Sequence, residues 1–151
     1  MEIFPELMEI ARKHGRTLLR TEKTTVELTS HIIDYLNRAL APQITRHGVL
    51  MNIYGQGVLM IGDSGIGKSE TAIELLKRGH RLIADDAVEI RKVAGNTLRG
   101  TSPELIRNYI EIRGIGVINV AKLFGMAAIK DESTVDLVVN IVPVGNEQIF
   151  D

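Results

Sequence analysis

The sequence predicts an α/β fold that is built around a phosphate-binding loop. Residues 62–69, GDSGIGKS, match the pattern G-x-x-x-x-G-K-[ST] at every fixed position. Before them, the apolar and partly β-branched residues 58–61 have the character of a buried strand, and after them residues 69–77 have helical spacing. Strand, glycine-rich turn and helix form the context that this motif needs. The alternative, a chance glycine–serine turn before a helix, explains fewer of these features.

The residues of the loop have distinct expected roles. Backbone N–H groups of a glycine-rich turn point inward, and the start of the following helix adds a partial positive charge. Lys68 is expected to be solvent-facing until a ligand arrives and then to reach the β- and γ-phosphates, while the Ser69 hydroxyl ligates Mg²⁺. The expected phosphate-binding residues are Gly62, Asp63, Ser64, Gly65, Ile66, Gly67, Lys68 and Ser69.

Composition restricts the class of protein. Lys plus Arg number 18 and Asp plus Glu number 19 in 151 residues, which argues against a dedicated nucleic-acid or membrane binder. A hydrophobic share of 44% is sufficient for a packed core. The chain has no cysteine, so it has neither disulfides nor thiolate metal ligands. The absence of a long apolar run and of a signal-peptide pattern predicts a cytoplasmic protein.

The first elements in chain order are helical. Residues 5–14 fit a short helix with proline near its first turn and Gly15 after its end, and residues 16–20 could form a brief strand. Thr24 and Glu27 have the spacing of a capping box, in which the threonine and glutamate side chains each bond the other residue's backbone amide. The helix that begins there is expected to continue to about Leu40.

Pro42 is expected to end this second helix. Two helices and at most one strand bury too little apolar surface to form a core of their own. We therefore expect residues 1–41 to be the end and linker helix of an N-terminal α/β domain, and residues 42–151 to be the phosphate-loop domain.

Several further elements are expected after the linker. In order, they are strands at 49–54 and 58–61 joined by a tight turn, a strand at 81–84 preceded by Gly79, a hairpin over 89–98 with its turn at 94–96, a short helix from Ser102, one or two helical turns over 119–124, and a central strand at 135–142. Residues 111–116 are expected to be largely irregular because they are rich in glycine.

Two adjacent carboxylates, Asp85 and Asp86, follow the strand expected at 81–84. An acidic strand end after a phosphate loop organises Mg²⁺ in phosphoryl-transfer enzymes. Neighbouring carboxylates repel, so one of the two pKa values should be raised, which would let one group carry a proton while the other stays ionised. The alternative is a solvent-facing acidic turn, since adjacent strand residues point to opposite faces.

Three other residues are candidates for chemistry. Glu111 and Arg113 are separated by one residue, so in an extended segment they share a face, where a carboxylate could bind metal and a guanidinium could bind phosphate. A surface ion pair is the alternative for these two residues. His47 stands beside Gly48, and its chemistry alone fits a structural role as well as a catalytic one.

The sequence resembles the HPr kinase/phosphorylase family. Three blocks carry the resemblance: HGVL at 47–50, GDSGIGKSETA at 62–72 continuing to HRLIADD at 80–86, and IEIRGIGVIN at 110–119. The last block is the specific one, because phosphate loops occur in many families. The resemblance covers residues 42–139, and it implies a kinase core similar to phosphoenolpyruvate carboxykinase.

The resemblance implies an activity and roles for individual residues. Family members phosphorylate a regulatory serine of the phosphocarrier protein HPr with ATP or pyrophosphate, reverse the reaction by phosphorolysis with inorganic phosphate, and assemble as hexamers. By this resemblance Ser69 and Glu111 hold Mg²⁺, Asp86 exchanges the serine proton, and Asp85 supports the metal and its water. His47 would then interact with the reacting phosphate.

The chain also departs from the family pattern. It has about half the family's length, and residues 143–147 and 150–151 differ from the family's usual acidic, aromatic and arginine-containing stretch. We therefore expect either a fragment or a shortened homologue, truncated at both ends. The competing interpretations are a related phosphate-loop kinase with another substrate and a nucleotide-sensing module without catalysis.

Overall fold

The computed structural model describes residues 4–93 and 95–143, apart from the side chain of Arg38. The chain divides into two compact units, residues 1–36 and residues 37–151, and each unit is described by itself. Most of the predicted departures from the family pattern, and one residue of the turn expected at 94–96, lie outside the described residues. No described helix combines the length and the apolar character needed to cross a membrane.

The first unit contains α1 (Pro5–Lys13) and begins α2 (Thr25–Ala39). The capping box is confirmed, since the Thr24 amide donates to Glu27 Oε2 over 2.9 Å and the Glu27 amide donates to Thr24 Oγ1 over 3.3 Å. The brief strand expected at 16–20 is wrong, because that segment has no neighbouring strand with which to form a ladder. No described side chain of this unit is buried.

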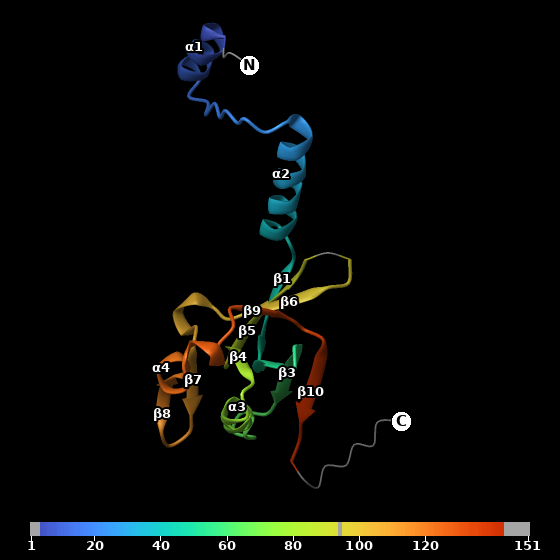
Figure 1. Cartoon of the computed structure of the whole chain (residues 1–151), viewed down its shortest axis with the longest axis vertical. Coiled ribbons are helices and arrows are strands. Elements are labelled where there is room, and N and C mark those ends of the chain that lie inside the picture. Colours follow the sequence, from blue (N-terminus) through green and yellow to red (C-terminus); the bar gives the residue numbers. More distant parts are fainter. Residues whose placement is uncertain (1–3, 94, 144–151) are drawn as a thin grey trace. The chain divides into compact units, whose positions relative to one another are not determined.

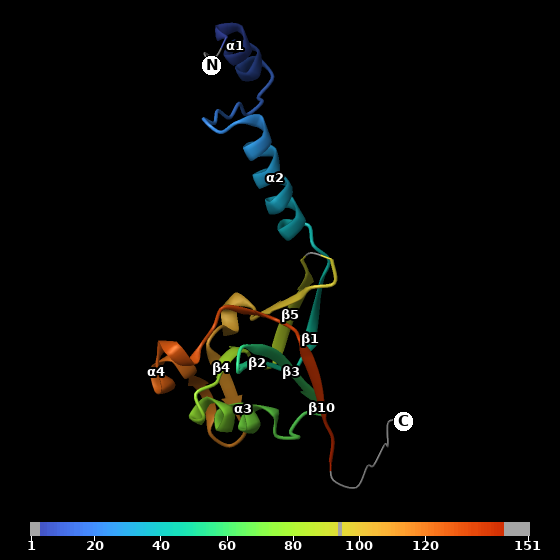
Figure 2. The same ribbon diagram turned by 45° about the vertical axis from the view of Figure 1, so that its right-hand side comes forward.

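A four-stranded sheet carries the phosphate loop in the second unit, in the order β10-β3-β2-β4 (Figure 1). Strands β2 (Val49–Ile53) and β3 (Gln56–Gly62) form the predicted antiparallel hairpin, and β4 (Arg81–Ala84) pairs with β2. Strand β10 (Leu137–Ile141) runs parallel to β3, and the two views of the chain show them side by side (Figure 2).

A central strand was expected at 135–142, and for the strands that the structure describes this expectation is wrong, because the strand found there is β10. It lies at the edge of its sheet, and four of its five residues are exposed. A run of valine and isoleucine is the pattern of a buried strand. Sequence character cannot say which strands of a sheet have neighbours on both sides, and here those strands are β3 and β2.

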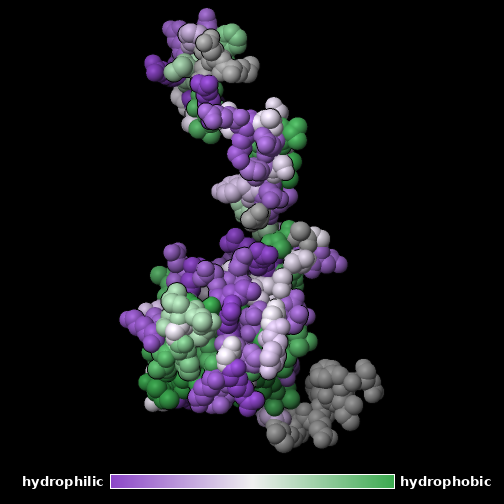
Figure 3. Space-filling view, viewed as in Figure 1, coloured by the Kyte–Doolittle hydropathy of each residue, from purple (hydrophilic) through white to green (hydrophobic). Residues whose placement is uncertain are grey.

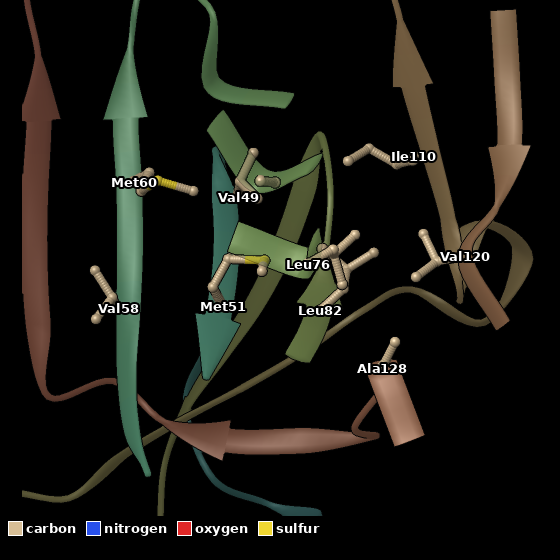
Figure 4. Close-up of a cluster of buried hydrophobic side chains, with 10 residues drawn as sticks. Val49, Met51, Val58, Met60, Leu76, Leu82, Ile110, Val120 and Ala128 are labelled. Atoms are coloured by element: carbon tan, nitrogen blue, oxygen red, sulfur yellow. The ribbon is translucent and has the colours of Figure 1, made fainter. Parts of the chain in front are cut away.

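Helix α3 (Lys68–Lys77) contributes Ala72 and Leu76 to the main core. This core lies between the helix, the phosphate-loop sheet and the segments that follow it (Figure 4). Its buried members are all aliphatic or methionine residues. They are Val49, Met51, Val58, Met60, Ala72, Leu76, Leu82, Ile110, Val120 and Ala128. The helix thus anchors the loop that precedes it.

A second sheet has the order β1-β5-β6-β9. Strands β5 (Ala87–Lys92) and β6 (Leu98–Thr101) form the predicted hairpin, and β9 is Glu132–Thr134. Strand β1 (Gln43–His47) was not predicted, because its five residues are all exposed and only one is a large apolar residue. It is an edge strand, which needs no apolar alternation.

The two sheets approach each other closely at two glycines. A Cβ on Gly57 of β3 would overlap the carbonyl oxygen of Thr134 in β9, and one on Gly100 of β6 would overlap Cδ2 of Leu50 in β2. The Asp136 carboxylate fastens the first contact by accepting the Gly57 amide over 2.7 Å and the Thr134 hydroxyl over 2.8 Å. These hydrogen bonds lower the pKa of Asp136.

The glycine-rich segment, expected to be irregular, is a hairpin of β7 (Tyr109–Ile112) and β8 (Gly116–Asn119). Gly114 and Gly116 have φ of 81° and 108°, so the glycines allow the chain to reverse instead of preventing strand pairing. The helix α4 (Val120–Phe124) follows as predicted and is capped by Asn119.

Two single turns of 3₁₀ helix complete the unit, η1 (Glu104–Ile106) and η2 (Met126–Ala128). The short helix expected from Ser102 is therefore only η1.

The core predicts a contrast between two leucines. Replacing Leu82, which is buried in the main core, by alanine should lower the free energy of unfolding by about 2–5 kcal/mol through lost burial and a residual cavity. Leu105→Ala removes the same atoms from an exposed residue and should change the free energy of unfolding by less than about 0.5 kcal/mol. Urea denaturation of both variants measures this difference, and equal losses would contradict the assignment of the core.

Candidate active site

The phosphate loop connects the end of β3 to the start of α3, as predicted. Gly62, Gly65 and Gly67 have φ of 147°, 80° and 102°, values that other residues rarely adopt. A Cβ on Gly62 would also lie 2.5 Å from the carbonyl oxygen of Ile141 in β10. Each glycine of the motif is therefore required by backbone conformation, and the first also by the neighbouring strand.

The expectation that Lys68 faces solvent is wrong. Its side chain is folded into the loop, with the residue only 6% exposed. The Nζ atom donates hydrogen bonds to the carbonyl oxygens of Gly62, over 2.8 Å, and Asp63, over 2.9 Å. The ammonium group therefore holds the loop's own backbone together, and a phosphate group would have to attract it away from at least one carbonyl.

Asp85 connects the loop to the β7–β8 hairpin. Its Oδ1 accepts the Ser69 hydroxyl over 3.0 Å, and its Oδ2 accepts the backbone amide of Glu111 over 2.9 Å. Burial raises the pKa of Asp85, the two hydrogen bonds oppose that shift, and the charge of Asp86 adds to it. The pKa of one carboxylate of the pair is thus raised, as predicted, but burial contributes more to this shift than the neighbouring charge does.

Asp86 points differently from its neighbour and forms a pair with His47. Its φ is 67°, a left-handed conformation, and its carbonyl oxygen accepts the Gly48 amide over 3.1 Å. The carboxylate oxygen Oδ1 lies 3.0 Å from His47 Nδ1, and both side chains are more than half exposed. The backbone turn after β4 therefore places one aspartate inside the protein and the other beside a histidine at the surface.

Arg113 lies over the phosphate loop. A Cβ built on Gly65 would be 2.8 Å from Nη1 of Arg113, so the guanidinium group occupies the space above that glycine. The hairpin that carries Glu111 and Arg113 is thus linked to the loop in two ways. The Arg113 guanidinium lies over Gly65, and the Asp85 carboxylate joins the Glu111 amide to the Ser69 hydroxyl. The shared face expected for Glu111 and Arg113 agrees with Ile112 between them being buried.

These residues surround one cleft of about 320 Å³. All six candidate catalytic residues line it, namely His47, Lys68, Asp85, Asp86, Glu111 and Arg113, together with Ser64, Gly65, Gly67 and Ser69 of the loop. Gly62, Asp63 and Ile66 are not among its lining residues. The lining also includes five residues that lie inside the recognised motif blocks but were given no role from the sequence, namely Val49, Glu70, Ile112, Gly114 and Gly116.

The oxygen ligands in the cleft suit a magnesium ion that arrives with phosphate groups. No group of three histidine, aspartate or glutamate residues within the described part of the chain could hold a metal by itself. Mg²⁺ prefers one or two protein oxygen ligands, with waters and substrate phosphates completing its octahedron. The Ser69 hydroxyl, already hydrogen-bonded to a carboxylate, and the Glu111 side chain in the same cleft fit that requirement.

The fold is a mixed α/β fold, and the loop that carries the phosphate-binding motif connects β3 to α3. The chain belongs to the family described as the HPr Serine kinase C-terminal domain, whose model matches residues 38–151.

Relatives and a solved structure agree with this family. The chain is 50% identical over its whole length to an HPr kinase/phosphorylase of Caldanaerobacter subterraneus subsp. tengcongensis, of which it covers 50%. It is 54% identical over 93% of its length to that of Caldicellulosiruptor bescii, of which it covers 45%. The chain thus spans about half the length of these relatives. A structure of the Hpr(Ser) kinase/phosphatase from Coxiella burnetii matches with a TM-score of 0.67 and 38% identity, covering 72% of this chain and 65% of that one.

The position of Lys68 predicts an effect on stability as well as on binding. Lys68→Ala leaves two loop carbonyl groups without their charged donor, which should lower the free energy of unfolding by about 1–3 kcal/mol. Lys77→Ala, in the same helix, loses only an exposed ion pair to Glu74 and should change it by less than about 1 kcal/mol. Urea denaturation tests this, and calorimetry should show Mg·ATP binding lost only in the first variant. Equal stabilities of the two variants would mean that the lysine does not hold the loop.

Burial of Asp85 predicts a pH effect on stability. Because its pKa is raised in the folded chain, the folded state binds this proton more tightly than the unfolded state does. Wild-type stability should therefore fall relative to Asp85→Asn as pH rises from the ordinary value of 3.8 through the raised one. Denaturant titrations of both proteins across this range, with a chelator present, measure the difference. A difference that stays constant or grows in favour of wild type would contradict the raised pKa.

Proposed function

We propose that this chain transfers a phosphoryl group from ATP or pyrophosphate to a regulatory serine of HPr, and that it reverses the transfer by phosphorolysis with inorganic phosphate. The observation that carries the proposal is the convergence of the phosphate loop, both aspartates and the β7–β8 hairpin on one cleft. Membership in the HPr Serine kinase C-terminal domain family supports the choice of substrate, as does the name of the relatives.

The forward reaction needs a base beside the serine hydroxyl. Asp86 is suited to this role because its carboxylate is more than half exposed and lines the cleft, whereas the Asp85 carboxylate accepts hydrogen bonds from Ser69 and Glu111. It would accept the serine proton as the serine oxygen bonds to phosphorus and the donor's bridging oxygen leaves with its bonding electrons. His47, 3.0 Å away, would orient the carboxylate.

The reverse reaction uses the same groups. An oxygen of inorganic phosphate would attack phosphorus of the phosphoserine, the bond to the serine oxygen would break, and pyrophosphate would form. The serine oxygen then needs a proton, which protonated Asp86 would return. Microscopic reversibility therefore assigns one residue to both directions.

The remaining residues would bind and orient phosphate groups. Lys68 would exchange a loop carbonyl for a phosphate oxygen, and Arg113 would approach the phosphates from above Gly65. Ser69 and Glu111 would hold Mg²⁺, which when bound would neutralise phosphate charge. Asp85 would fix the Ser69 hydroxyl and the Glu111 backbone in their positions.

The proposal extends to the architecture. The strand, loop and helix around residues 62–69 support a kinase core similar to phosphoenolpyruvate carboxykinase, and the coreless helices before them support a remnant of an N-terminal domain. The hexameric assembly and the cytoplasmic location stay predictions from the resemblance and the composition.

One assay tests the activity directly. The chain is incubated with HPr, Mg²⁺ and ATP labelled at the γ-phosphate, and phosphoserine is then measured. Transfer to HPr supports the proposal. Nucleotide binding without transfer would contradict it and favour a nucleotide-sensing module.

The assignment of Asp86 predicts a matched loss in both directions. Asp86→Asn should slow phosphorylation and phosphorolysis by similar factors, on the order of 10²–10⁴, because a general acid–base group is removed. The affinity for Mg·ATP should change little, since the loop binds the phosphates. Both rates are measured side by side, with Asp131→Asn as a control because Asp131 is exposed and does not line the cleft. If Asp86→Asn spared either direction while Asp85→Asn abolished both, the other carboxylate would be the base.

A further inference from the structure

The cleft has no excess of positive charge, although phosphate groups are its expected ligands. Two of its lining side chains carry a fixed positive charge, Lys68 and Arg113. His47 lies 3.0 Å from Asp86 and, when protonated, balances only that carboxylate. The lining carboxylates are Glu70, Asp85, Asp86 and Glu111. A polyphosphate that entered without a counterion would therefore meet at least as much negative charge as positive charge.

The two fixed cations are not neutralised by these carboxylates. Lys68 donates to the carbonyl oxygens of Gly62 and Asp63. Within the described residues no ion pair joins Lys68 or Arg113 to a carboxylate, and the Arg113 guanidinium lies over Gly65 instead. Positive and negative groups thus stay separate in the cleft, so a bound phosphate group would interact with both kinds.

Glu70 lies where its charge acts most directly on a ligand of the phosphate loop. It directly follows Ser69, is exposed, and is the acidic residue of the first turn of α3. Hydrophilic residues form the surface where α3 lies (Figure 3). The cap residue of this helix is Gly67, so no capping side chain bonds the first N–H groups. The partial positive charge of this helix end attracts a carboxylate and a phosphate alike, and the two therefore repel each other there.

The other three carboxylates of the cleft already have contacts or a proposed ligand. Asp85 accepts two hydrogen bonds, and Asp86 lies beside His47. Glu111 is the residue that we propose as a ligand of Mg²⁺. The Glu70 carboxylate, in contrast, forms no hydrogen bond or ion pair with any residue that the structure describes. Its contribution to the cleft is therefore its charge.

We propose that Glu70 determines a specificity of the cleft, namely the selection of phosphate groups that carry Mg²⁺ over the same groups without metal. This inference rests on the proposed function, because it requires that Mg²⁺ complexes of polyphosphates are the ligands. Glu70 repels a metal-free polyphosphate, whereas Mg²⁺ bound to the phosphates lowers their net charge and with it the repulsion. A metal-free nucleotide or pyrophosphate would occupy the cleft without the ion that neutralises phosphate charge during transfer, so its exclusion keeps the cleft available for the reactive complex.

The test is calorimetric titration of wild type and three variants with pyrophosphate, in buffer without divalent cations and in buffer with Mg²⁺. Glu70→Gln removes the charge and keeps the shape, whereas Glu70→Asp keeps the charge. Glu104→Gln removes an equal charge from an exposed residue that does not line the cleft. For metal-free pyrophosphate, Kd should fall about fivefold in Glu70→Gln and stay within about twofold of wild type in the other two. For Mg·pyrophosphate, Kd should stay within about twofold of wild type in all three.

Salt separates an effect of charge from an effect of shape. At about 1 M salt the Debye length is roughly 3 Å, so the gain of Glu70→Gln for metal-free pyrophosphate should disappear. A gain that persists at this salt concentration would come from a changed local structure and would overturn the proposal.

The other outcomes also decide against this role of Glu70. Metal-free affinity that is equal in wild type and Glu70→Gln, or undetectable in both, overturns it. So does a wild-type chain that binds metal-free pyrophosphate as tightly as Mg·pyrophosphate. Weaker binding of Mg·pyrophosphate by Glu70→Gln would make the carboxylate a ligand of the metal instead of a selector.

Failure of this inference and failure of the proposed function are distinguishable. If wild type forms phosphoserine on HPr while Glu70→Gln binds both forms of pyrophosphate as wild type does, only the role of Glu70 is wrong. If Glu70→Gln shows the expected gain but wild type forms no phosphoserine, only the proposed transfer to HPr is wrong.

Discussion

The buried carboxylate of Asp85 is the group on which the arrangement of the cleft depends. It binds a hydroxyl of the phosphate-loop helix with one oxygen and a backbone amide of the β7–β8 hairpin with the other. The loop and the hairpin are far apart in the sequence, and this residue ties them across the cleft. Burial raises the carboxylate's pKa, so the contact combines a desolvation cost with two compensating hydrogen bonds.

The same short turn gives the two aspartates different environments. Asp86 takes a left-handed conformation, and its carbonyl oxygen receives the amide that follows His47. This conformation is uncommon for a residue other than glycine, and such residues often occur at functional sites. Here it turns one carboxylate inward to support the loop and leaves the other beside a histidine in the open cleft. Two identical side chains thereby have different surroundings, one buried and hydrogen-bonded and the other exposed beside His47.

Close contacts of backbone with neighbouring groups decide how the elements are assembled. Gly57 and Gly100 let the second sheet approach the first without a Cβ between them, and Gly62 lets β10 pass beside the start of the loop. Lys68 then closes the loop by bonding two of its carbonyl oxygens. The phosphate loop is thus held by contacts on its outside and by its own lysine on its inside.

The sequence by itself determined the elements whose causes are local. The phosphate loop, the hairpin that leads into it, the capping box at Thr24 and the short helix after Asn119 all follow from residue types at fixed spacing, and the structure contains each of them. All six candidate catalytic residues line the cleft, and each belongs to one of the motif blocks recognised in the sequence.

Only the tertiary structure decided the rest. Strand β10 is an edge strand although its residues suit a central one, and β1 forms although its residues are exposed and mostly polar, because pairing depends on which neighbours the fold supplies. The burial of Lys68 and the dominance of desolvation over charge at Asp85 likewise depend on the groups that surround a side chain in space. A sequence pattern records the residue type, whereas these properties come from contacts between residues that are distant along the chain.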